Sequence, residues 1–380
     1  MQSVYKVADV LNLESEHLHK LCLNSWQERT LHALRKCRTQ ALGGHIDACN
    51  CCKKLHISYN SCRNRHCPTC QGHKQKQWVQ KRITELLPVG YFHVVFTLPS
   101  ELNQVCMHNP KVIYNSLFKA AWATLQDFSK SPKHLGAKMG MISILHTWGQ
   151  NMSLHPHLHC IVPGGGVTKS GKWKHAKNKG KFLFPVKAMS VVFRAKYVAE
   201  LRKQLPGLPQ NLYDKLFSKK WVVYAKPPFS KPENVVEYLG RYTQKIAISN
   251  HRITHINKVQ KQVTFWVKDY KQGGKKRKLT LTNDEFIRRF SLHILPKGFT
   301  RIRHYGILSS GWKKEKLPNL QLQLGGEYYI NRLPKIEEKT DLRRCFSCKK
   351  GTLITLLIFD KRGPPNNWEM KCKAKIKEIK

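Results

Sequence analysis

Apolar residues recur at helical spacing over much of the chain and predict its helices. Over residues 1–44, leucines and a tryptophan return every three or four positions, and Gly43-Gly44 end the pattern. The same spacing predicts further helices, the first of which ends at Pro88 because proline cannot continue a helix. These further helices are expected at residues 75–87, 110–129, 186–205, 233–248 and 283–292.

Apolar and alternating stretches between these helices predict strands. Residues 91–98, 139–150 and 155–162 give the clearest patterns, and shorter strands are expected at 263–267 and 278–282, around a basic turn. The link between the second and third strands is short enough for a hairpin. The pattern as a whole predicts an α+β fold.

These elements divide the chain into three regions. Its 380 residues leave room for two or three domains. Residues 1–88 combine helices with a zinc-ribbon-like cysteine cluster, and residues 89–312 hold most of the strands. Residues 313–380 are expected to form a basic C-terminal tail with a Cys-x-x-Cys pair, and the alternating lysines at its end predict disorder.

The charge of the chain indicates a polyanionic partner. Lysine and arginine exceed aspartate and glutamate by 68 to 23, a formal net charge of +45. Basic side chains that displace counterions from phosphates give affinity for nucleic acid, so DNA is the expected partner. RNA or ribosome binding and adsorption to an anionic membrane are the alternatives. No apolar run approaches the ~18 residues of a membrane span and no secretory signal is recognisable, so a cytoplasmic location is expected.

Two Cys-x-x-Cys pairs predict a zinc site. Cys49 with Cys52 and Cys67 with Cys70 have the spacing of a zinc ribbon, in which each pair presents two thiolates to one half of a tetrahedron. We expect these four residues to bind a structural Zn²⁺, because four thiolates leave no coordination position for a substrate.

Further donors and basic side chains lie close to these pairs in the sequence. Arg63 and Arg65 are expected to contact DNA phosphates. The more distant pair, Cys345 and Cys348, offers only half a metal site and is equally expected in an ordinary tail. Donors that could replace a zinc ligand or serve a second ion are Cys51, Cys62, His45 and His66.

The strand predicted at 155–162 carries a histidine pair. Alternate residues of a strand share a face, so His157 and His159 project side by side and could bind a divalent cation. Gln150 on the preceding strand is the first choice for a third ligand, with His146 and His155 as alternatives. Such a ligand set suits a catalytic Mg²⁺ or Mn²⁺ that polarises a phosphate. Packed or solvent-facing histidines are the competing explanation.

Two tyrosines lie on the helix predicted at 233–248. Tyr238 and Tyr242 are four residues apart, so they share one face of a helix, and Arg241 beside them could bind phosphate. A tyrosine needs activation because its ordinary pKa is near 10. With a metal ion to polarise the phosphate, either tyrosine could attack DNA. Taken alone, the pair would be read as aromatic core residues.

The set of motifs resembles the rolling-circle transposases of the HUH endonuclease superfamily, specifically the insertion-sequence group with an N-terminal zinc-binding domain and two tyrosines. The resemblance covers about residues 25–312. It implies a central antiparallel sheet flanked by helices, a metal-binding pair at His157 and His159, nucleophiles at Tyr238 and Tyr242, and a 5′-phosphotyrosine intermediate. The motifs are CRTQALGGH (37–45), NSCRNRHCPTCQ (60–71), YFHVVFTLPSELN (91–103), LHTWGQNMSLHPHLHCIVPGGG (145–166), YLGRYTQKIAISNHRI (238–253) and FIRRFSLHILPKGFTRIRHYG (286–306).

The expected function is therefore that of a DNA transposase that nicks and rejoins single-stranded DNA at element ends. It needs no nucleotide cofactor, because no phosphate-binding Gly-x4-Gly-Lys-Ser/Thr loop is present. A plasmid relaxase or replication initiator with the same chemistry is one alternative. A zinc-dependent nucleic-acid-binding protein without catalysis is the other.

Overall fold

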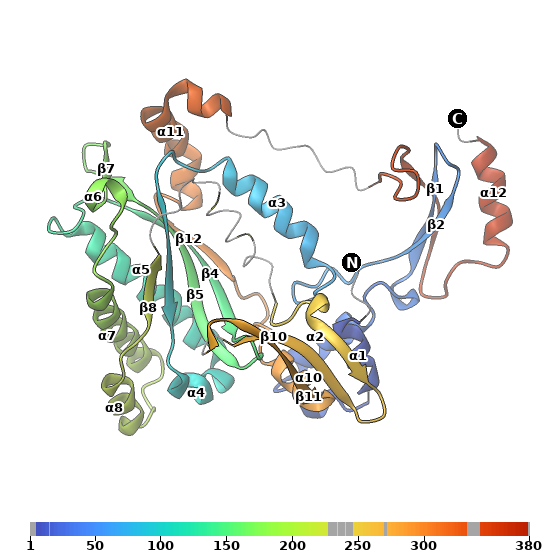
Figure 1. Cartoon of the computed structure of the whole chain (residues 1–380), viewed down its shortest axis with the longest axis horizontal. Coiled ribbons are helices and arrows are strands. Elements are labelled where there is room, and N and C mark those ends of the chain that lie inside the picture. Colours follow the sequence, from blue (N-terminus) through green and yellow to red (C-terminus); the bar gives the residue numbers. More distant parts are fainter. Residues whose placement is uncertain are drawn as a thin grey trace.

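The computed structural model describes residues 5–14, 16–226, 246–269, 272–332 and 343–378, together with Asn234 and Gly240. Within them lies a central antiparallel sheet with the strand order β12-β4-β5-β3-β8 (Figure 1). Strands β4 and β5 form the predicted hairpin, and the three clearest strand predictions are confirmed. The strands are β3 (Tyr91–Thr97), β4 (Gly140–Trp148), β5 (Leu154–Pro163), β8 (Val223–Lys226) and β12 (Ile302–Gly306).

Long helices cover one face of this sheet. Phe96 of β3 and Leu158 of β5 are buried in the same core cluster as Leu117 and Phe193, which come from the helices predicted at 110–129 and 186–205. Both helix predictions are confirmed. The helices of this region are α4 (Asn103–His108), α5 (Pro110–Lys130), α6 (Lys177–Gly180), α7 (Val186–Gln204) and α8 (Gln210–Ser218), and the short strands β6 (Gly165–Val167) and β7 (Trp173–His175) pair beside them.

The opposite face of the sheet packs against α3 (Gln71–Ile83) and α11 (Ser310–Arg332). Ile144 of β4 and Ile161 of β5 share a buried cluster with Leu317 of α11, and Val79 of α3 packs against the same cluster. Helix α3 begins directly after Cys70, earlier than the sequence predicts. Helix α11 is interrupted at Gly326, whose φ of 61° lies in the left-handed region that favours glycine.

The N-terminal helices form a second core with residues that come much later in the chain. Leu11 of α1 (Val7–Leu13) and Leu31 of α2 (Ser25–Arg35) are buried with Phe265 and Phe286. These phenylalanines belong to the antiparallel sheet β11-β10-β9 and to the helix that follows it. The predicted N-terminal region is thus joined to residues 253–291 by its packing. The later elements are β9 (Ile253–Asn257), β10 (Gln262–Asp269), β11 (Lys275–Thr282) and α10 (Asn283–Ser291).

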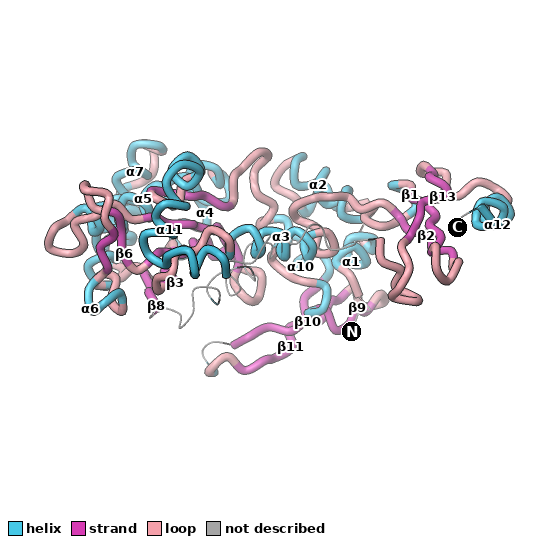
Figure 2. Tube along the Cα trace, turned by 90° about the horizontal axis from the view of Figure 1, so that it is seen from above, coloured by secondary structure: helices cyan, strands magenta, loops and turns pink. Residues whose placement is uncertain are grey.

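A third sheet joins residues 44–59 to the C-terminal part of the described chain. Strand β13 (Leu353–Phe359) pairs with β1 (Gly44–Cys49), which also pairs with β2 (Leu55–Tyr59). Helix α12 (Trp368–Glu378) packs on this sheet around Ile46, Phe359 and Cys372. The sheet and α12 lie at one end of the molecule, away from the central sheet (Figures 1 and 2). The predicted disorder at the end of the tail is wrong up to residue 378, because lysine-rich residues there belong to α12.

The helix predicted at 233–248 lies largely outside the described residues. Of its positions, Asn234 and Gly240 have helical backbone, and residues 246–248 are not helical. Among the helices that are described, none has a stretch both long enough and apolar enough to cross a membrane.

Candidate active site and cysteine centres

Three histidines converge on the central sheet. In the β4–β5 hairpin, His146 lies opposite His157 and Ile144 lies opposite His159, so the three imidazoles share one face. One ring nitrogen from each lies within 4.8 Å of the others. This face is the one that carries Ile144 and Ile161 and packs against α3 and α11.

The hydrogen bonds of His157 orient its ring for metal binding. Its Nδ1 lies 2.7 Å from the backbone oxygen of His155, and because a carbonyl oxygen only accepts, Nδ1 carries the proton and Nε2 holds the lone pair. Burial lowers the pKa of His157 to about 4, although the hydrogen bond to His155 acts in the opposite direction. The ring is therefore neutral near pH 7, as a metal ligand must be.

His159 is oriented by a residue that the sequence analysis did not single out. Nδ1 of His159 lies 2.9 Å from Nε2 of His93, a buried histidine on β3, and the two rings are stacked. Burial lowers the pKa of His93 to about 4. Its signal in the sequence is a histidine within the otherwise apolar run that forms β3.

The two Nε2 atoms of the predicted pair face each other. They lie 3.2 Å apart. When Nδ1 of His159 donates to His93, both Nε2 atoms present lone pairs, which repel unless a cation lies between them. Neighbouring ligands at ~2.1 Å from an octahedral ion are about 3.0 Å apart, so the observed separation fits such an ion.

Gln150 was ranked first as the third ligand from the sequence, and the structure groups His146 with the histidine pair. His146, an alternative in the sequence analysis, is buried and its ring centroid lies 4.7 Å from that of His159. It is held by stacking on Trp148, with centroids 4.5 Å apart. Gln150 lies beyond the end of β4, in the turn to β5, where its backbone oxygen accepts a hydrogen bond from Arg252. The exposed His155 contributes its carbonyl to His157.

The predicted tyrosines Tyr238 and Tyr242 and their neighbour Arg241 lie outside the described residues. Gly240, which lies between the tyrosines in the sequence, is described and buried. A Cβ atom at Gly240 would lie 2.2 Å from Cγ2 of Val79 in α3. The backbone at Gly240 therefore approaches α3 more closely than any residue with a side chain allows.

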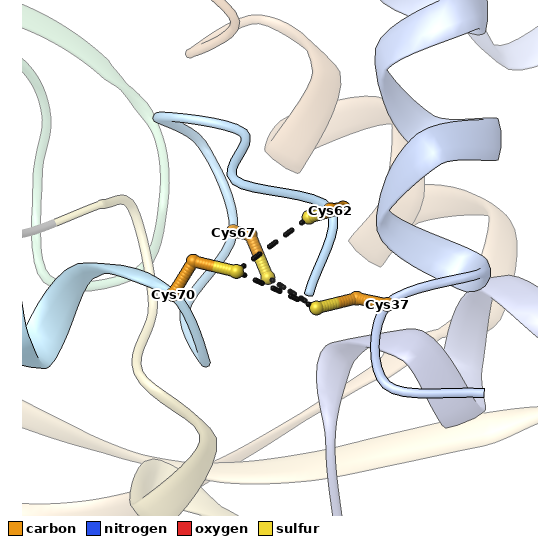
Figure 3. Close-up of side chains that lie close together, drawn as sticks. All are labelled: Cys37, Cys62, Cys67 and Cys70. Atoms are coloured by element: carbon orange, nitrogen blue, oxygen red, sulfur yellow. Dashed lines mark hydrogen bonds between the residues drawn. The ribbon is translucent and has the colours of Figure 1, made fainter. Parts of the chain in front are cut away.

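Cysteines form two separate groups of four. The first consists of Cys37 after α2, Cys62 in the loop after β2, and Cys67 and Cys70 just before α3 (Figure 3). The Sγ atoms of Cys37 and Cys70 are 3.5 Å apart, and those of Cys62 and Cys70 are 3.7 Å apart. Ligands of a tetrahedral zinc at ~2.3 Å from the metal are about 3.8 Å apart, so this group fits Zn²⁺.

The second group combines Cys49 and Cys52 with Cys345 and Cys348. Backbone N–H donors of Gly351 and Lys350 lower the pKa of the Cys348 thiol to about 6. The prediction that one ion is shared by Cys49, Cys52, Cys67 and Cys70 is therefore corrected. The pairs were recognised, but Cys67 and Cys70 group with Cys37 and Cys62, whereas Cys49 and Cys52 group with the distant Cys345 and Cys348. Of the other donors considered, Cys62 joins the first group.

The two arginines expected at DNA occupy different environments. Arg63 is exposed, as a phosphate-binding side chain would be. Arg65 is half-buried, and its guanidinium donates to the backbone oxygens of Pro296 and Phe299. Arg65 therefore links the loop between Cys62 and Cys67 to the segment before β12.

Comparisons with known proteins find similarity to transposases. Residues 140–316 match the family model Y2_Tnp, described as "Putative transposase", and residues 10–98 match the model described as "Transposase zinc-binding domain". "Putative transposase y4qJ" of Sinorhizobium fredii (strain NBRC 101917 / NGR234) is 40% identical over 394 residues, which cover 96% of this chain and 98% of that protein. "Transposase for insertion sequence element IS801" of Pseudomonas savastanoi pv. phaseolicola is 25% identical over 364 residues, which cover 88% of this chain and 85% of that protein.

Proposed function

The chain belongs to the IS91 family of insertion-sequence transposases, and we propose that it nicks and rejoins single-stranded DNA through a covalent 5′-phosphotyrosine. The observation that carries the proposal is the convergence of three imidazoles on one face of the central sheet. As a transposase the chain acts on DNA, and its net charge of +45 suits a polyanion.

His157, His159 and His146 would hold a Mg²⁺ or Mn²⁺ ion. When bound, the ion polarises the scissile phosphate and offsets the charge that builds on its oxygens. The chain's own contribution is to fix the ligands before DNA arrives. The carbonyl of His155 holds His157 in the tautomer that binds a metal, and the ring of His93 would do the same for His159 by accepting from its Nδ1.

Tyr238 or Tyr242 would supply the nucleophile. The phenol gives up its proton as its oxygen bonds to phosphorus, the bond from phosphorus to the 3′ oxygen breaks, and that oxygen takes up a proton to become a free 3′-OH. Attack by a 3′-OH on the phosphotyrosine reverses these steps and rejoins DNA. Two tyrosines would allow successive strand transfers, in which one holds DNA while the other attacks.

The position of Gly240 supports a role for the tyrosines beside the histidines. Gly240 lies against Val79, and Val79 packs against the cluster of Ile144 and Ile161. These isoleucines are two residues away from His146 and His159 on their strands and share their face. Gly240, between the two tyrosines in the sequence, thus lies against α3 on the histidine-bearing side of the sheet.

The test is formation of a covalent protein–DNA adduct. The full chain is incubated with labelled single-stranded DNA from the ends of its own element, with Mn²⁺ or with EDTA. We expect a metal-dependent adduct that survives denaturation, is reduced in Tyr238→Phe or Tyr242→Phe, and is lost in the double variant. An adduct that persists in the double variant, or none from a folded chain that binds DNA, would reject the proposed chemistry.

A further inference from the structure

The second cysteine group joins residues that are almost 300 positions apart. Cys49 and Cys52 lie at the turn between β1 and β2, and Cys345 and Cys348 lie just before β13. We propose that these four cysteines bind a second Zn²⁺, separate from the one in the first group, and that this ion clasps residues 343–378 to the β1–β2 hairpin. The matched zinc-binding model covers residues 10–98 and so includes only half of this site.

The sulfur geometry fits a tetrahedral ion. The Sγ atoms of Cys49 and Cys348 are 3.6 Å apart, those of Cys52 and Cys345 are 3.8 Å apart, and all four ligand atoms lie within 4.8 Å of one another. The value for thiolates around zinc is about 3.8 Å. A disulfide needs its sulfur atoms at about 2.05 Å, so neither of these two pairs is a disulfide.

Both Cys-x-x-Cys knuckles of this group, residues 49–52 and 345–351, direct backbone N–H donors to the sulfurs. The N–H groups of Cys51 and Cys52 lie 3.4 Å from Sγ of Cys49, and the N–H of Gly351 lies 3.4 Å from Sγ of Cys348. Donors of this kind surround the ligand atoms of metal sites and orient them. A Cβ at residue 351 would lie 2.5 Å from Sγ of Cys49, so only glycine permits the two knuckles to come this close.

The surroundings indicate a structural ion rather than a catalytic one. Cys49 and Cys345 are buried, and Nε2 of His56 on β2 lies 3.6 Å from Sγ of Cys345. The ring of Phe346 packs against His56 with centroids 4.2 Å apart. Four sulfur ligands would fill the coordination sphere and leave no position for water or substrate.

The module around this site has little else to hold it together. Its described apolar core consists of the small clusters around Ile46, Phe359 and Cys372 and around Leu353. Cores of this size rarely stabilise a small unit, which is why such units recruit a metal. The ion would therefore supply much of the free energy that keeps β13 on β1.

Metal content of the full chain tests the proposal. We expect two zinc ions per purified wild-type chain by mass spectrometry of the metal, and one in the Cys345→Ser/Cys348→Ser variant. Cys51→Ser is the matched control, because Cys51 is an exposed neighbour outside the group, and it should keep both ions. A Cys345→Ser/Cys348→Ser variant that still holds two ions would overturn the proposal.

Hydrogen exchange on the wild-type chain tests separately whether the ion holds β13 on β1. It needs no folded variant. Amides of β13 should be protected in the zinc-loaded wild type and exchange rapidly after a chelator removes zinc, while amides of β4 and β5 remain protected. Protection of β13 that is unchanged by loss of the second ion would show that the strand is held without it.

Discussion

At the scale of single residues, the third metal ligand can be tested against its rival. We expect His146→Ala to lose the Mn²⁺-dependent DNA adduct as completely as His157→Ala, because both remove an imidazole from the group of three. Gln150→Ala should keep the adduct, since the residue lies in the turn beyond β4. Adduct yield against Mn²⁺ concentration is the measurement. Loss of the adduct in Gln150→Ala with retention in His146→Ala would restore the ranking made from the sequence.

His93 offers a second prediction at this scale, as a positioning residue. His93→Leu removes the partner of Nδ1 of His159 without removing a ligand. Substitutions of this kind weaken metal binding by about 10–100-fold. The Mn²⁺ concentration for half-maximal adduct formation should rise by that factor, and the yield at saturating Mn²⁺ should recover. A yield that stays low at every Mn²⁺ concentration would instead indicate a damaged sheet.

The sequence predicted the histidine pair but not its full environment. His157 and His159 were found because alternation along one strand is a local property. The role of His93 depends on which strand lies beside β5, and periodicity within one stretch of chain does not specify that pairing. His146 was an alternative for the same reason, since its share in the site depends on the register of the hairpin.

At the scale of elements, the contact between α3 and Gly240 should affect the rate at which the tyrosines react with DNA. Gly240→Ala places a Cβ 2.2 Å from Cγ2 of Val79, so one of the two segments must move. A displacement of about 1 Å at a reacting group can cost about 100-fold in rate. We expect the rate of adduct formation to fall by about this factor, with binding of single-stranded DNA retained.

A compensating variant makes this prediction specific. Val79→Ala removes Cγ2, and a Cβ at residue 240 then lies 3.7 Å from Cβ of residue 79, which is ordinary contact. The double variant Val79→Ala/Gly240→Ala should recover most of the rate, and Val79→Ala alone should remain active. If the double variant is as slow as Gly240→Ala, the close approach to α3 is not what limits the tyrosines.

Elements built from local patterns were predicted well, and elements closed by distant residues were not. The β4–β5 hairpin and α5 follow from periodicity within a single stretch of chain. The Cys-x-x-Cys pairs were also recognised, but the prediction from spacing alone assigned Cys49 and Cys67 to the same zinc ion. Each pair instead meets residues brought by the tertiary fold, Cys37 in one case and Cys345 in the other. For the same reason, β13 was read as part of a tail.

At the scale of the whole molecule, the two cysteine groups connect different parts. The first lies between α2 and the start of α3, which follows Cys70 directly, and α3 carries Val79 to the contact with Gly240. The second lies in the terminal module, which sits away from the central sheet (Figure 1). Substitution of cysteines in the first group should therefore disturb the active site through α3, whereas substitution in the second group should not.

Matched pairs of serine substitutions separate these two effects. Cys67→Ser/Cys70→Ser frees the start of α3, so the rate of adduct formation on a short oligonucleotide should fall by about 100-fold, as expected for a misplaced nucleophile. Cys345→Ser/Cys348→Ser removes the same number of thiols and should leave this rate within about twofold, because adduct formation depends on groups around the central sheet and α3. Rates are compared at saturating Mn²⁺, with circular dichroism to confirm that both variants are folded. Equal losses in the two variants would mean that the terminal module reaches the active site by a route other than α3.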